Sequence, residues 1–404
     1  MANSVPGKVL FISHEASRSG APIVLLHLLK WIKKNTNLQF EILLLTGGKL
    51  KPDFELVAKT FLLSDLTGQH TYRHRVKKKL LKITADDQHK KAADYLSKRG
   101  YDLVYGNTIV SVPWLKLFKE NHSIKTICCV HELSYVINYF YSNEYLQENL
   151  NLVDCVIAVS NAVKENFMNS YNLPDGKVKL HYEFIDTDNG RIFNNLKKDD
   201  LGVDAEEFVI GMGGNPEWRK GADLLIPLAL KLKELHPDFK FRIVWLGAGI
   251  ENEFVKQLLY DARKCKIDDR LVFIESHPNP LDFINIFDVF VLLSREDPFP
   301  LIALEAAFLK KPVIAFENSG GMPELIRQGA GFLAPYLDTV QVANEVYKLS
   351  KNAALKNQIG DKASELVIST FSSAVVSPNI YGLIKNLIGP PHPINEAVER
   401  GNKL

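Results

Sequence analysis

The sequence predicts an α/β protein made of two Rossmann-like domains that face each other across a cleft. Short apolar runs rich in β-branched residues alternate with amphipathic helical stretches through most of the 404 residues, a pattern typical of parallel sheets covered by helices. The length suggests two or three domains of about 100 to 200 residues each. Residues 172–201, rich in Asn, Asp, Gly and Lys, interrupt the alternation and are expected to form a loop or hinge.

Each half of the chain contains its own series of expected strands. The first series is Val9–Ile12, Phe40–Leu45, Leu103–Tyr105, Ile124–Val130 and Val153–Val159. The second is Val209–Met212, Phe241–Leu246, Leu271–Ile274, Val289–Leu293 and Val313–Phe316. We therefore place one domain over residues 1–190 and another over 191–376. An amphipathic helix and tail over 377–404 follow, and packing of that helix back on the first domain is one arrangement for it.

Composition narrows the class of function and the compartment. The 49 Lys and Arg nearly balance the 47 Asp and Glu, which argues against a protein that mainly binds nucleic acid. The four cysteines have neither metal-ligand spacing nor a disulfide pattern, as expected in a reducing compartment. The apolar run at the start is too short for a signal peptide, and no later run is long enough to span a membrane. We expect a cytoplasmic protein, with any membrane contact peripheral and at the inner face.

The loop after Val289–Leu293 carries the strongest chemical pattern. Asp297 lies in this loop, and seven residues separate it from Glu305 in the following helix. Pro300 suits a first helical turn, whose N–H groups can receive a phosphate. One carboxylate can then face a sugar while the other accepts hydrogen bonds from a ribose diol. For two isolated acids, surface charges would be the simpler interpretation.

Two further strand ends carry candidate residues. Arg219 and Lys220 follow the Gly-rich segment after Val209–Met212 and precede helical sequence. Cations at a helix N-terminus oppose its dipole, so they indicate an anion nearby, such as a leaving diphosphate. His131 directly follows Ile124–Val130 and is expected at the cleft edge, although a lone histidine is often structural. Gly20 and Ala21 open a helix after the first strand, where the backbone can approach a ligand closely.

Taken together, these segments resemble the retaining glycosyltransferases of family 4, which have the two-domain GT-B fold. The Asp297-to-Glu305 region is similar to their E-x7-E motif. Supporting segments, in the same order along the chain, are Gly20-Ala21-Pro22, Val130-His131-Glu132, Asp154 to Ser160, Arg219-Lys220-Gly221, Leu246-Gly247-Ala248-Gly249 and Gly320-Gly321-Met322-Pro323-Glu324. The resemblance departs at Asp297, where the family usually has Glu, and at Gly214, where many relatives carry a phosphate-binding Arg.

The resemblance implies transfer of a hexose-type sugar from a nucleotide diphosphate sugar to an acceptor hydroxyl, with no cofactor and no metal. The second domain would hold most of the donor, and the first would face a glycan or lipid-linked acceptor. The catalytic residues implied are His131, Asp297 and Lys220. The donor-binding residues implied are Gly20, Ala21, Arg219, Lys220, Asp297, Phe299, Pro300, Leu301, Ile302 and Glu305.

Other interpretations stay open from the sequence. A sugar-nucleotide epimerase of related two-domain fold, or a catalytically silent nucleotide-sugar-binding protein, would use similar domains. Asp186-Thr187-Asp188 has the pattern of a divalent-metal site but falls in the expected hinge. The basic run from Arg73 to Lys82 is by default a solvated helix face, and its functional alternative is contact with an anionic membrane.

Overall fold

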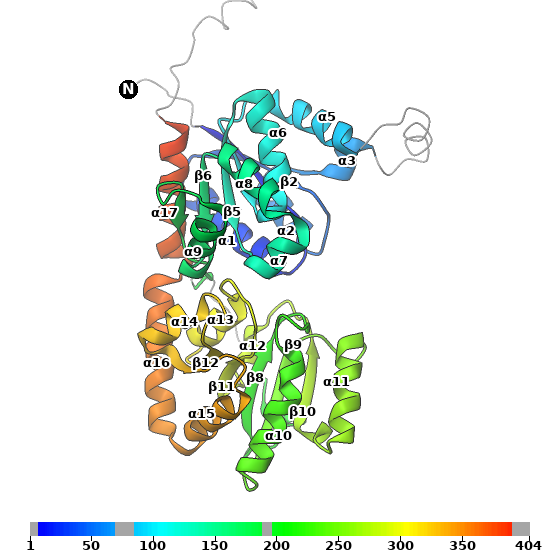
Figure 1. Ribbon diagram of the computed structural model, residues 1–404, viewed down its shortest axis with the longest axis vertical. Coiled ribbons are helices and arrows are strands. Elements are labelled where there is room, and N and C mark those ends of the chain that lie inside the picture. The colour runs from blue at the N-terminus through cyan, green and yellow to red at the C-terminus, as the bar shows by residue number, and fades with distance from the viewer. Residues whose placement is uncertain (1–6, 69–84, 188–195, 390–404) are drawn as a thin grey trace, which may run out of the picture. The chain divides into compact units, whose positions relative to one another are not determined.

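The structure is a computed structural model that describes residues 7–68, 85–187 and 196–389. The chain divides into two compact units (Figure 1). Unit 1 comprises Met1–Val159, Lys164–His181 and Val376–Leu404, and unit 2 comprises Ser160–Val163 and Tyr182–Val375. The chain therefore enters unit 2 earlier than the expected boundary near residue 190 and returns to unit 1 at its end.

Unit 1 contains a seven-stranded sheet in the order β3-β2-β1-β4-β5-β6-β7, and all neighbouring strands are parallel. The strands are β1 (Lys8–Ser13), β2 (Gln39–Leu44), β3 (Thr60–Leu62), β4 (Leu103–Asn107), β5 (Lys125–Val130), β6 (Cys155–Ala158) and β7 (Val178–Leu180). The helices are α1 (Gly20–Asn35), α2 (Lys51–Val57), α3 (Leu63–Thr67), α5 (Ala85–Ser97), α6 (Val112–His122), α7 (Ser134–Phe140), α8 (Asn143–Leu152), α9 (Asn161–Tyr171), which begins in the part of the chain assigned to unit 2, and α17 (Ser373–Ile388).

Unit 2 contains a six-stranded parallel sheet in the order β10-β9-β8-β11-β12-β13. The strands are β8 (Phe208–Gly213), β9 (Phe241–Gly247), β10 (Leu271–Glu275), β11 (Val289–Leu292), β12 (Val313–Phe316) and β13 (Gly331–Ala334). The helices are α10 (Leu225–Leu235), α11 (Glu253–Lys264), α12 (Leu281–Ile284), α13 (Leu301–Phe308), α14 (Met322–Leu325), α15 (Thr339–Lys351) and α16 (Ala353–Thr370).

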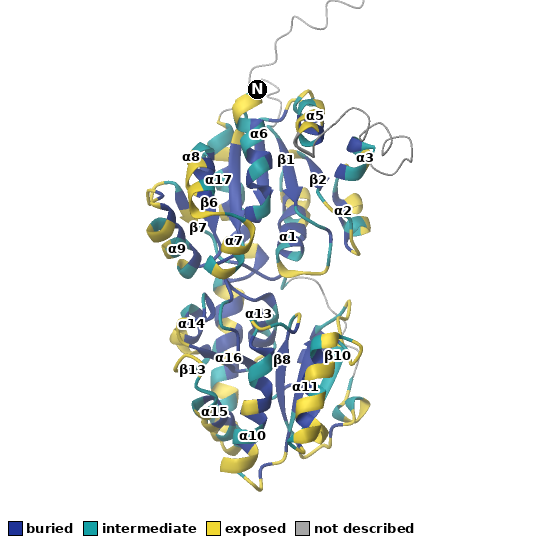
Figure 2. Cartoon of the chain, turned by 45° about the vertical axis from the view of Figure 1, so that its right-hand side comes forward, coloured by how far each residue is buried: buried dark blue, intermediate teal, exposed yellow. Residues whose placement is uncertain are grey.

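These sheets confirm the predicted α/β class with two Rossmann-like domains. The central strands are buried in both units (Figure 2), which explains why they read as continuous apolar runs. Alternate residues of a strand face opposite sides of the sheet. In β8, Ile210 belongs to the core that contains Leu228 of α10 and Val346 of α15, whereas a side chain on Gly213, which faces the other side, would collide with Ile302 of α13. Helices therefore cover both faces of this sheet.

The sequence analysis missed three edge strands: β3, β7 and β13. Each has only three or four residues, too few for a clear alternation of apolar and polar positions. The expectation that residues 172–201 form only a loop was wrong at β7, where Val178 is buried and Lys179 is exposed. Within the described ranges, no helix combines the length and apolar character needed to cross a membrane.

Unit 1 is completed by α17, the last helix that the structure describes. α17 begins at Ser373, earlier than the expected start at residue 377. Its buried residues include Ile380 and Ile384, and the ring of Tyr381 lies 6.2 Å from that of Trp31 in α1. The helix thus covers apolar surface formed by the opposite end of the sequence.

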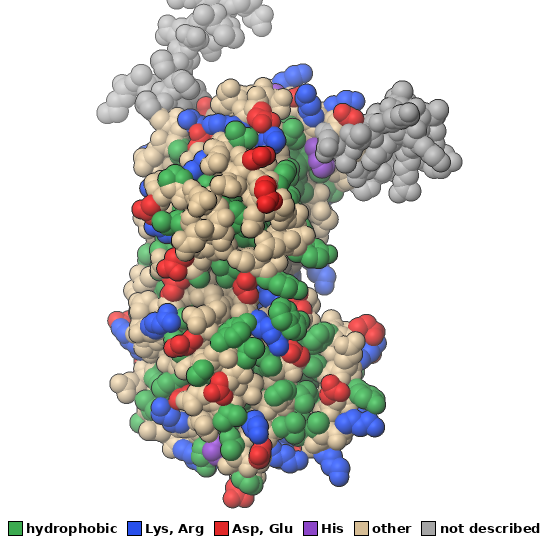
Figure 3. Space-filling view, in the orientation of Figure 1, with side chains coloured by type: hydrophobic (Ala, Val, Ile, Leu, Met, Phe, Trp, Pro, Cys, Tyr) green, Lys and Arg blue, Asp and Glu red, His purple; other side chains and the backbone are tan. Residues whose placement is uncertain are grey.

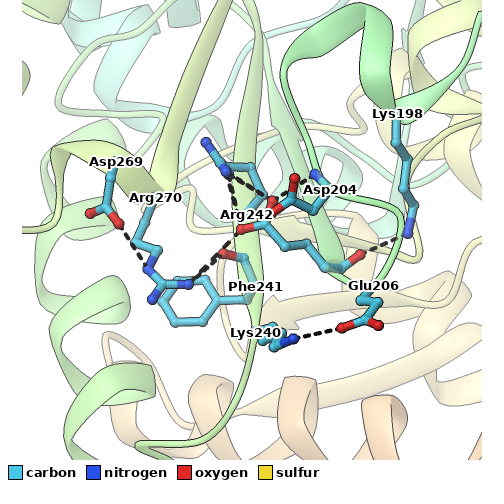
Figure 4. A network of polar contacts seen from close by, with 9 residues as sticks. Lys198, Asp204, Glu206, Lys240, Phe241, Arg242, Asp269 and Arg270 are labelled. Atoms are coloured by element: carbon cyan, nitrogen blue, oxygen red, sulfur yellow. Dashed lines mark hydrogen bonds and ion pairs between the residues drawn. The ribbon is translucent and has the colours of Figure 1, made fainter.

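Charged side chains of both signs are interspersed over the face of the molecule in Figure 3, in keeping with the small net charge of +2. A network of polar contacts that includes Lys240, Arg242 and Arg270 lies near the amino ends of β8 and β9 (Figure 4). Glu207 directly precedes β8. The Glu207 carboxylate, whose side chain is only 7% exposed, accepts hydrogen bonds from Arg242 at 2.9–3.3 Å. The backbone N–H of Asp204 donates a further hydrogen bond of 3.0 Å. Since the carboxylate is buried and hydrogen-bonded to both residues, it holds the turn before β8 against β9.

We expect Glu207→Gln to lower the free energy of unfolding by about 1 to 3 kcal/mol, because the hydrogen bonds to Arg242 lose their charge. Urea unfolding of the purified protein measures this change. The matched control is Glu206→Gln, since Glu206 pairs with Lys240 through side chains that are 76% and 67% exposed. An exposed pair contributes little, so this control should unfold like the wild type. Equal behaviour of the two variants would contradict the structural role of Glu207.

Unit 1 has a similar cluster around Glu41, at the amino ends of its strands. Arg99 donates hydrogen bonds of 2.6 and 2.5 Å to the Glu41 carboxylate, and the Tyr101 hydroxyl donates one of 2.5 Å. Burial opposes ionisation, but these hydrogen bonds and the charges of Lys8 and Arg99 outweigh it and lower the pKa of Glu41 from 4.5 to about 2.

A carboxyl group whose pKa is lower in the folded state stabilises that state at pH values above its unfolded-state pKa. This contribution is lost as the pH falls toward the folded-state pKa. We therefore expect the stability difference between wild type and Glu41→Gln to be largest near neutral pH and to shrink between pH 4.5 and about 2. Urea unfolding of both proteins over this range measures the difference. A difference that stays constant with pH would contradict the assignment.

Candidate active site

The candidate site of unit 2 lies at the carboxyl ends of its strands. β8 and β11 are neighbours in the sheet, and the strand order reverses between them. In open α/β sheets, ligands bind just beyond such a reversal. The loop after β8 carries Arg219 and Lys220, and the loop after β11 carries Asp297. Two loops that are far apart in sequence therefore meet where a ligand is expected.

Lys220 and Asp297 form the centre of this site. The Lys220 ammonium is paired with the Asp297 carboxylate, and their side chains are 16% and 5% exposed. Ser294, itself buried, donates from its hydroxyl to the same carboxylate oxygen at 3.3 Å. The backbone of Asp297 is fixed as well: its N–H donates to the Ser319 carbonyl at 2.7 Å, and its carbonyl accepts from Gly321 N–H at 3.1 Å. The site thus holds a charged pair in a defined position.

Two glycines allow the loops to approach each other closely. Gly221 has φ +68°, and a Cβ there would lie 1.8 Å from the Leu293 carbonyl oxygen. Gly214 has φ +110°, a conformation that favours glycine. The Trp245 indole donates to the Gly214 carbonyl at 2.9 Å and fixes this turn. The backbone conformation of this turn therefore favours the glycine that the sequence has at position 214.

Arg219 lies beside this pair, and its guanidinium contacts both loops. One nitrogen donates to the Glu296 carbonyl at 2.8 Å, and the other donates to Glu217 at 2.9 Å. A second arginine, which the sequence analysis did not select, acts in the same way. Arg295 forms two 2.7 Å hydrogen bonds to Asp223 and lies 4.6 Å from the ring centroid of Trp218. Both arginines connect the loops after β8 and β11. The only signal for Arg295 in the sequence was its position next to Glu296 and Asp297.

The remaining predicted donor residues surround the start of α13. Pro300 is its N-cap residue, and the first amides with a hydrogen bond to the Pro300 carbonyl are those of Ala303 and Leu304. The amides of Leu301 and Ile302 therefore lie in the first turn, where a helix offers N–H groups to an anion. Glu305, half-buried, follows in the same helix.

Phe299 differs from the other predicted donor residues because its side chain is buried within unit 2. Its ring lies 5.6 Å from that of Tyr182 and 5.1 Å from that of Phe371. The side chain thus anchors the loop in front of α13, and any donor contact at this position would come from the backbone.

In unit 1, His131 and the start of α1 come together at the carboxyl edge of the sheet. Nε2 of half-buried His131 lies 2.9 Å from Oδ1 of Asn107, an acceptor, so the imidazole donates from this nitrogen. The Asn107 amide donates in turn to the Ala21 carbonyl at 2.9 Å. Gly20 is the first residue of α1. One asparagine at the end of β4 therefore links the histidine to the predicted Gly20-Ala21 turn.

The loop between β1 and α1 contains a polar cluster that the sequence analysis missed. Glu15 accepts hydrogen bonds from Ser17 at 2.5 Å and Ser19 at 2.9 Å, and His14 lies 3.5 Å from its carboxylate. Burial and the charge of His131 lower the pKa of His14, against the opposing effect of Glu15. The signal in the sequence was His14-Glu15 directly after a strand, the same arrangement that drew attention to His131-Glu132.

No group of three or more potential metal-binding side chains occurs in the described part of the chain. Asp188, the second acid of the Asp186-Thr187-Asp188 pattern, lies outside the described residues, as does the basic run from Arg73 to Lys82.

Comparison with known proteins identifies the family and supports the fold. The family described as Glycosyl transferases group 1 matches residues 194–366, and Glycosyltransferase Family 4 matches residues 18–189. N-acetyl-alpha-D-glucosaminyl L-malate synthase of Bacillus anthracis is 28% identical over 57% of this chain and 59% of its own length. The capsular polysaccharide biosynthesis glycosyltransferase CapM of Staphylococcus aureus is 23% identical over 55% of this chain and 58% of its own length. The matched region thus spans less than two thirds of these relatives.

Solved structures match over a longer range. The crystal structure of Anabaena Alr3699/HepE in complex with UDP and glucose has a TM-score of 0.75 and 20% identity, covering 94% of this chain and 99% of that one. Sucrose-phosphate synthase of Thermosynechococcus elongatus has a TM-score of 0.73 and 18% identity, with coverage of 94% and 99%. The chain therefore belongs to the group 1 glycosyltransferases and has the GT-B fold.

Proposed function

We propose that the protein is a retaining glycosyltransferase that moves a hexose-type sugar from a nucleotide diphosphate sugar to an acceptor hydroxyl without a metal ion. The observation that carries this proposal is the Lys220–Asp297 pair at the strand-order reversal of unit 2. Family membership supports the reaction type. Within the pair, the Lys220 ammonium supplies the positive charge that departure of a diphosphate requires.

Lys220 has the central role in the proposed reaction. The bond between the sugar's C1 and the diphosphate oxygen breaks, and the acceptor oxygen forms a new bond to C1 on the same face. The acceptor's proton passes to the departing phosphate oxygen, so no protein base is needed. The Lys220 ammonium offsets the negative charge that develops on the leaving diphosphate, and Asp297 and Ser294 keep the ammonium in place.

Other residues hold the donor in this proposal. The first-turn amides of α13 at Leu301 and Ile302 bind phosphate oxygens, Glu305 accepts hydrogen bonds from the ribose hydroxyls, and Asp297 also faces the sugar. Arg219 contributes mainly by fixing the two loops, since both of its terminal nitrogens already contact Glu217 and the Glu296 carbonyl. His131 positions a sugar or acceptor hydroxyl at the edge of the other sheet.

Relatives suggest which substrates to try first. Anabaena HepE has been solved with UDP and with UDP-glucose, and relatives include capsular polysaccharide and lipopolysaccharide core glycosyltransferases. We therefore propose a UDP or GDP sugar as donor and a glycan or lipid-linked acceptor. Peripheral contact with an anionic membrane through Arg73 to Lys82 stays part of the proposal.

A donor screen tests the proposed activity. UDP and GDP sugars are first ranked by the rise in melting temperature that they cause, because a ligand of the folded state stabilises it. The best donor, carrying a radiolabelled sugar, is then incubated with candidate acceptors. Label transferred with retained anomeric configuration supports the proposal. An isomerised donor would instead indicate an epimerase, and binding without turnover would indicate a silent binding protein.

We expect the transferase activity to survive EDTA. The charges of Lys220 and the amides at the start of α13 are proposed to replace the metal that other transferases use at the diphosphate. The measurement is the initial rate of transfer before and after dialysis against chelator, with magnesium or manganese added back as the control. Loss of activity in EDTA with recovery on adding metal would contradict this mechanism and draw attention to Asp186-Thr187-Asp188.

A further inference from the structure

An exposed aromatic surface lies on α7 of unit 1. Tyr135, Tyr139 and Phe140 are 54%, 83% and 48% exposed, although aromatic side chains of this size are usually more buried. Tyr135 and Tyr139 are four residues apart and therefore share one side of the helix. Figure 2 shows how much of α7 is exposed. Both phenol rings therefore present at least half of their surface to solvent.

The backbone that carries these rings is firmly held. Ile137, on the other side of α7, is fully buried. The Ser134 hydroxyl donates to Asn166 of α9 at 2.7 Å, and after the helix Tyr141 stacks on Tyr145 with ring centroids 5.2 Å apart. The two exposed rings are thus presented by a fixed helix, which reduces the entropy lost when a ligand binds.

The surface follows the candidate site of unit 1 directly in the chain. β5 ends at Val130, and α7 begins at Ser134, three positions after His131. The short connection is held by Glu132, whose carboxylate accepts a hydrogen bond of 2.9 Å from the His131 N–H. A ligand on α7 would therefore extend toward the histidine that the proposed function places near the acceptor.

The chemistry of α7 selects the kind of ligand. Residues 134–143 include no charged side chain, and the nearest charged residues in sequence that flank them, Glu132 and Glu144, are acidic. Because these residues include no cation, they offer an anionic polymer or an anionic membrane no electrostatic attraction. Three exposed rings on a seven-residue helix are also far too small a surface for a stable protein partner, which needs about 1,200 Å² or more in total.

An uncharged glycan fits these features. The axial C–H bonds of a sugar ring pack on the negative face of an aromatic ring, and the phenol hydroxyl can bond to sugar hydroxyls. Residues four apart on a helix are separated by about 6 Å along the axis, close to the length of one sugar unit. We infer that Tyr135 and Tyr139 form a stacking surface for an uncharged oligosaccharide acceptor, an inference that rests on the proposed function.

The test uses maltohexaose, cellohexaose and chitohexaose as probes, with saturation-transfer NMR on the full chain in the absence of nucleotide. We expect at least one probe to bind the wild type, and Tyr139→Ala to weaken this binding about five- to tenfold. Tyr139→Phe, which keeps the ring, should stay within about twofold. The matched control is Tyr95→Ala, because Tyr95 on α5 is similarly exposed at 51% and lies outside this surface.

Several results would overturn the inference. One is that the wild type binds none of the probes. The others are that Tyr139→Ala binds the probe as well as the wild type does, or that Tyr95→Ala loses as much probe binding as Tyr139→Ala. Binding to phosphatidylcholine vesicles that is lost in Tyr139→Ala, with no oligosaccharide bound, would assign the surface to a membrane instead. Binding of UDP, measured on the same proteins, separates the two proposals. If no nucleotide binds while oligosaccharide binding depends on Tyr139, the transferase proposal fails and the glycan surface stands.

Discussion

Lys220→Ala is expected to lower kcat by about 10²- to 10³-fold, with a much smaller change in the KM for the nucleotide sugar. The Lys220 ammonium offsets charge that appears mainly as the diphosphate departs, so its loss affects the transition state more than the bound donor. The partner of Lys220, Asp297, is almost completely buried. The variant therefore needs a check that it is folded, by circular dichroism and thermal unfolding, alongside steady-state kinetics.

A second lysine–aspartate pair in unit 2 provides the matched control. Lys356 donates to Asp288 at 2.6 Å, at the amino end of β11 and away from the candidate site. Lys356→Ala should lower stability, as removal of any partly buried partner does, yet leave kcat unchanged. If both variants lost activity equally, or if folded Lys220→Ala kept wild-type kcat, Lys220 would not have the proposed role.

Glu305→Gln is expected to weaken binding of the nucleoside diphosphate by about 10- to 100-fold, because a charge-assisted hydrogen bond to the ribose becomes a neutral one. Isothermal titration with the nucleotide selected in the donor screen measures this change. The effect should appear in Kd and in the donor KM, with kcat at saturating donor reduced far less, in contrast to Lys220→Ala.

A ribose analogue makes this prediction specific. A 2′,3′-dideoxy nucleoside diphosphate lacks the hydroxyl donors, so wild type and Glu305→Gln should bind it with equal, weak affinity. Glu365→Gln is the control for charge alone, since Glu365 lies on the surface of the same unit and is paired with Lys362. If Glu305→Gln weakened binding of the analogue as much as binding of the parent nucleotide, Glu305 would act elsewhere than at the ribose.

Much of the fold could be predicted from the sequence because buried parallel strands are continuous apolar runs. The ten predicted strands appear in this way, whereas β3, β7 and β13 lie at sheet edges and are mostly only partly buried. The clusters around Glu41 and Glu207 were also missed. Their members come from distant segments, and only the strand order brings, for example, Glu207 next to Arg242.

The residues of the candidate site could be predicted from their positions in loops after strands, but their contacts with one another could not. Strand ends identified Lys220 and Asp297 separately, but their pairing depends on β8 and β11 being neighbours. The sequence also could not show that the Arg219 guanidinium contacts Glu217 and the Glu296 carbonyl or that the Phe299 ring is buried, because both depend on the direction of one side chain. The assignment of site residues to catalysis and donor binding stays a prediction.

The return of the chain to unit 1 has a consequence for synthesis on the ribosome. Unit 1 needs α17, the last helix described, whereas most of unit 2 lies within the run 182–375. A nascent chain can therefore complete the core of unit 2 first, although that unit comes second in sequence. Until residues 373–388 emerge, the apolar surface around Trp31 stays uncovered, and it is during this interval that a chaperone or a neighbouring nascent chain can bind it.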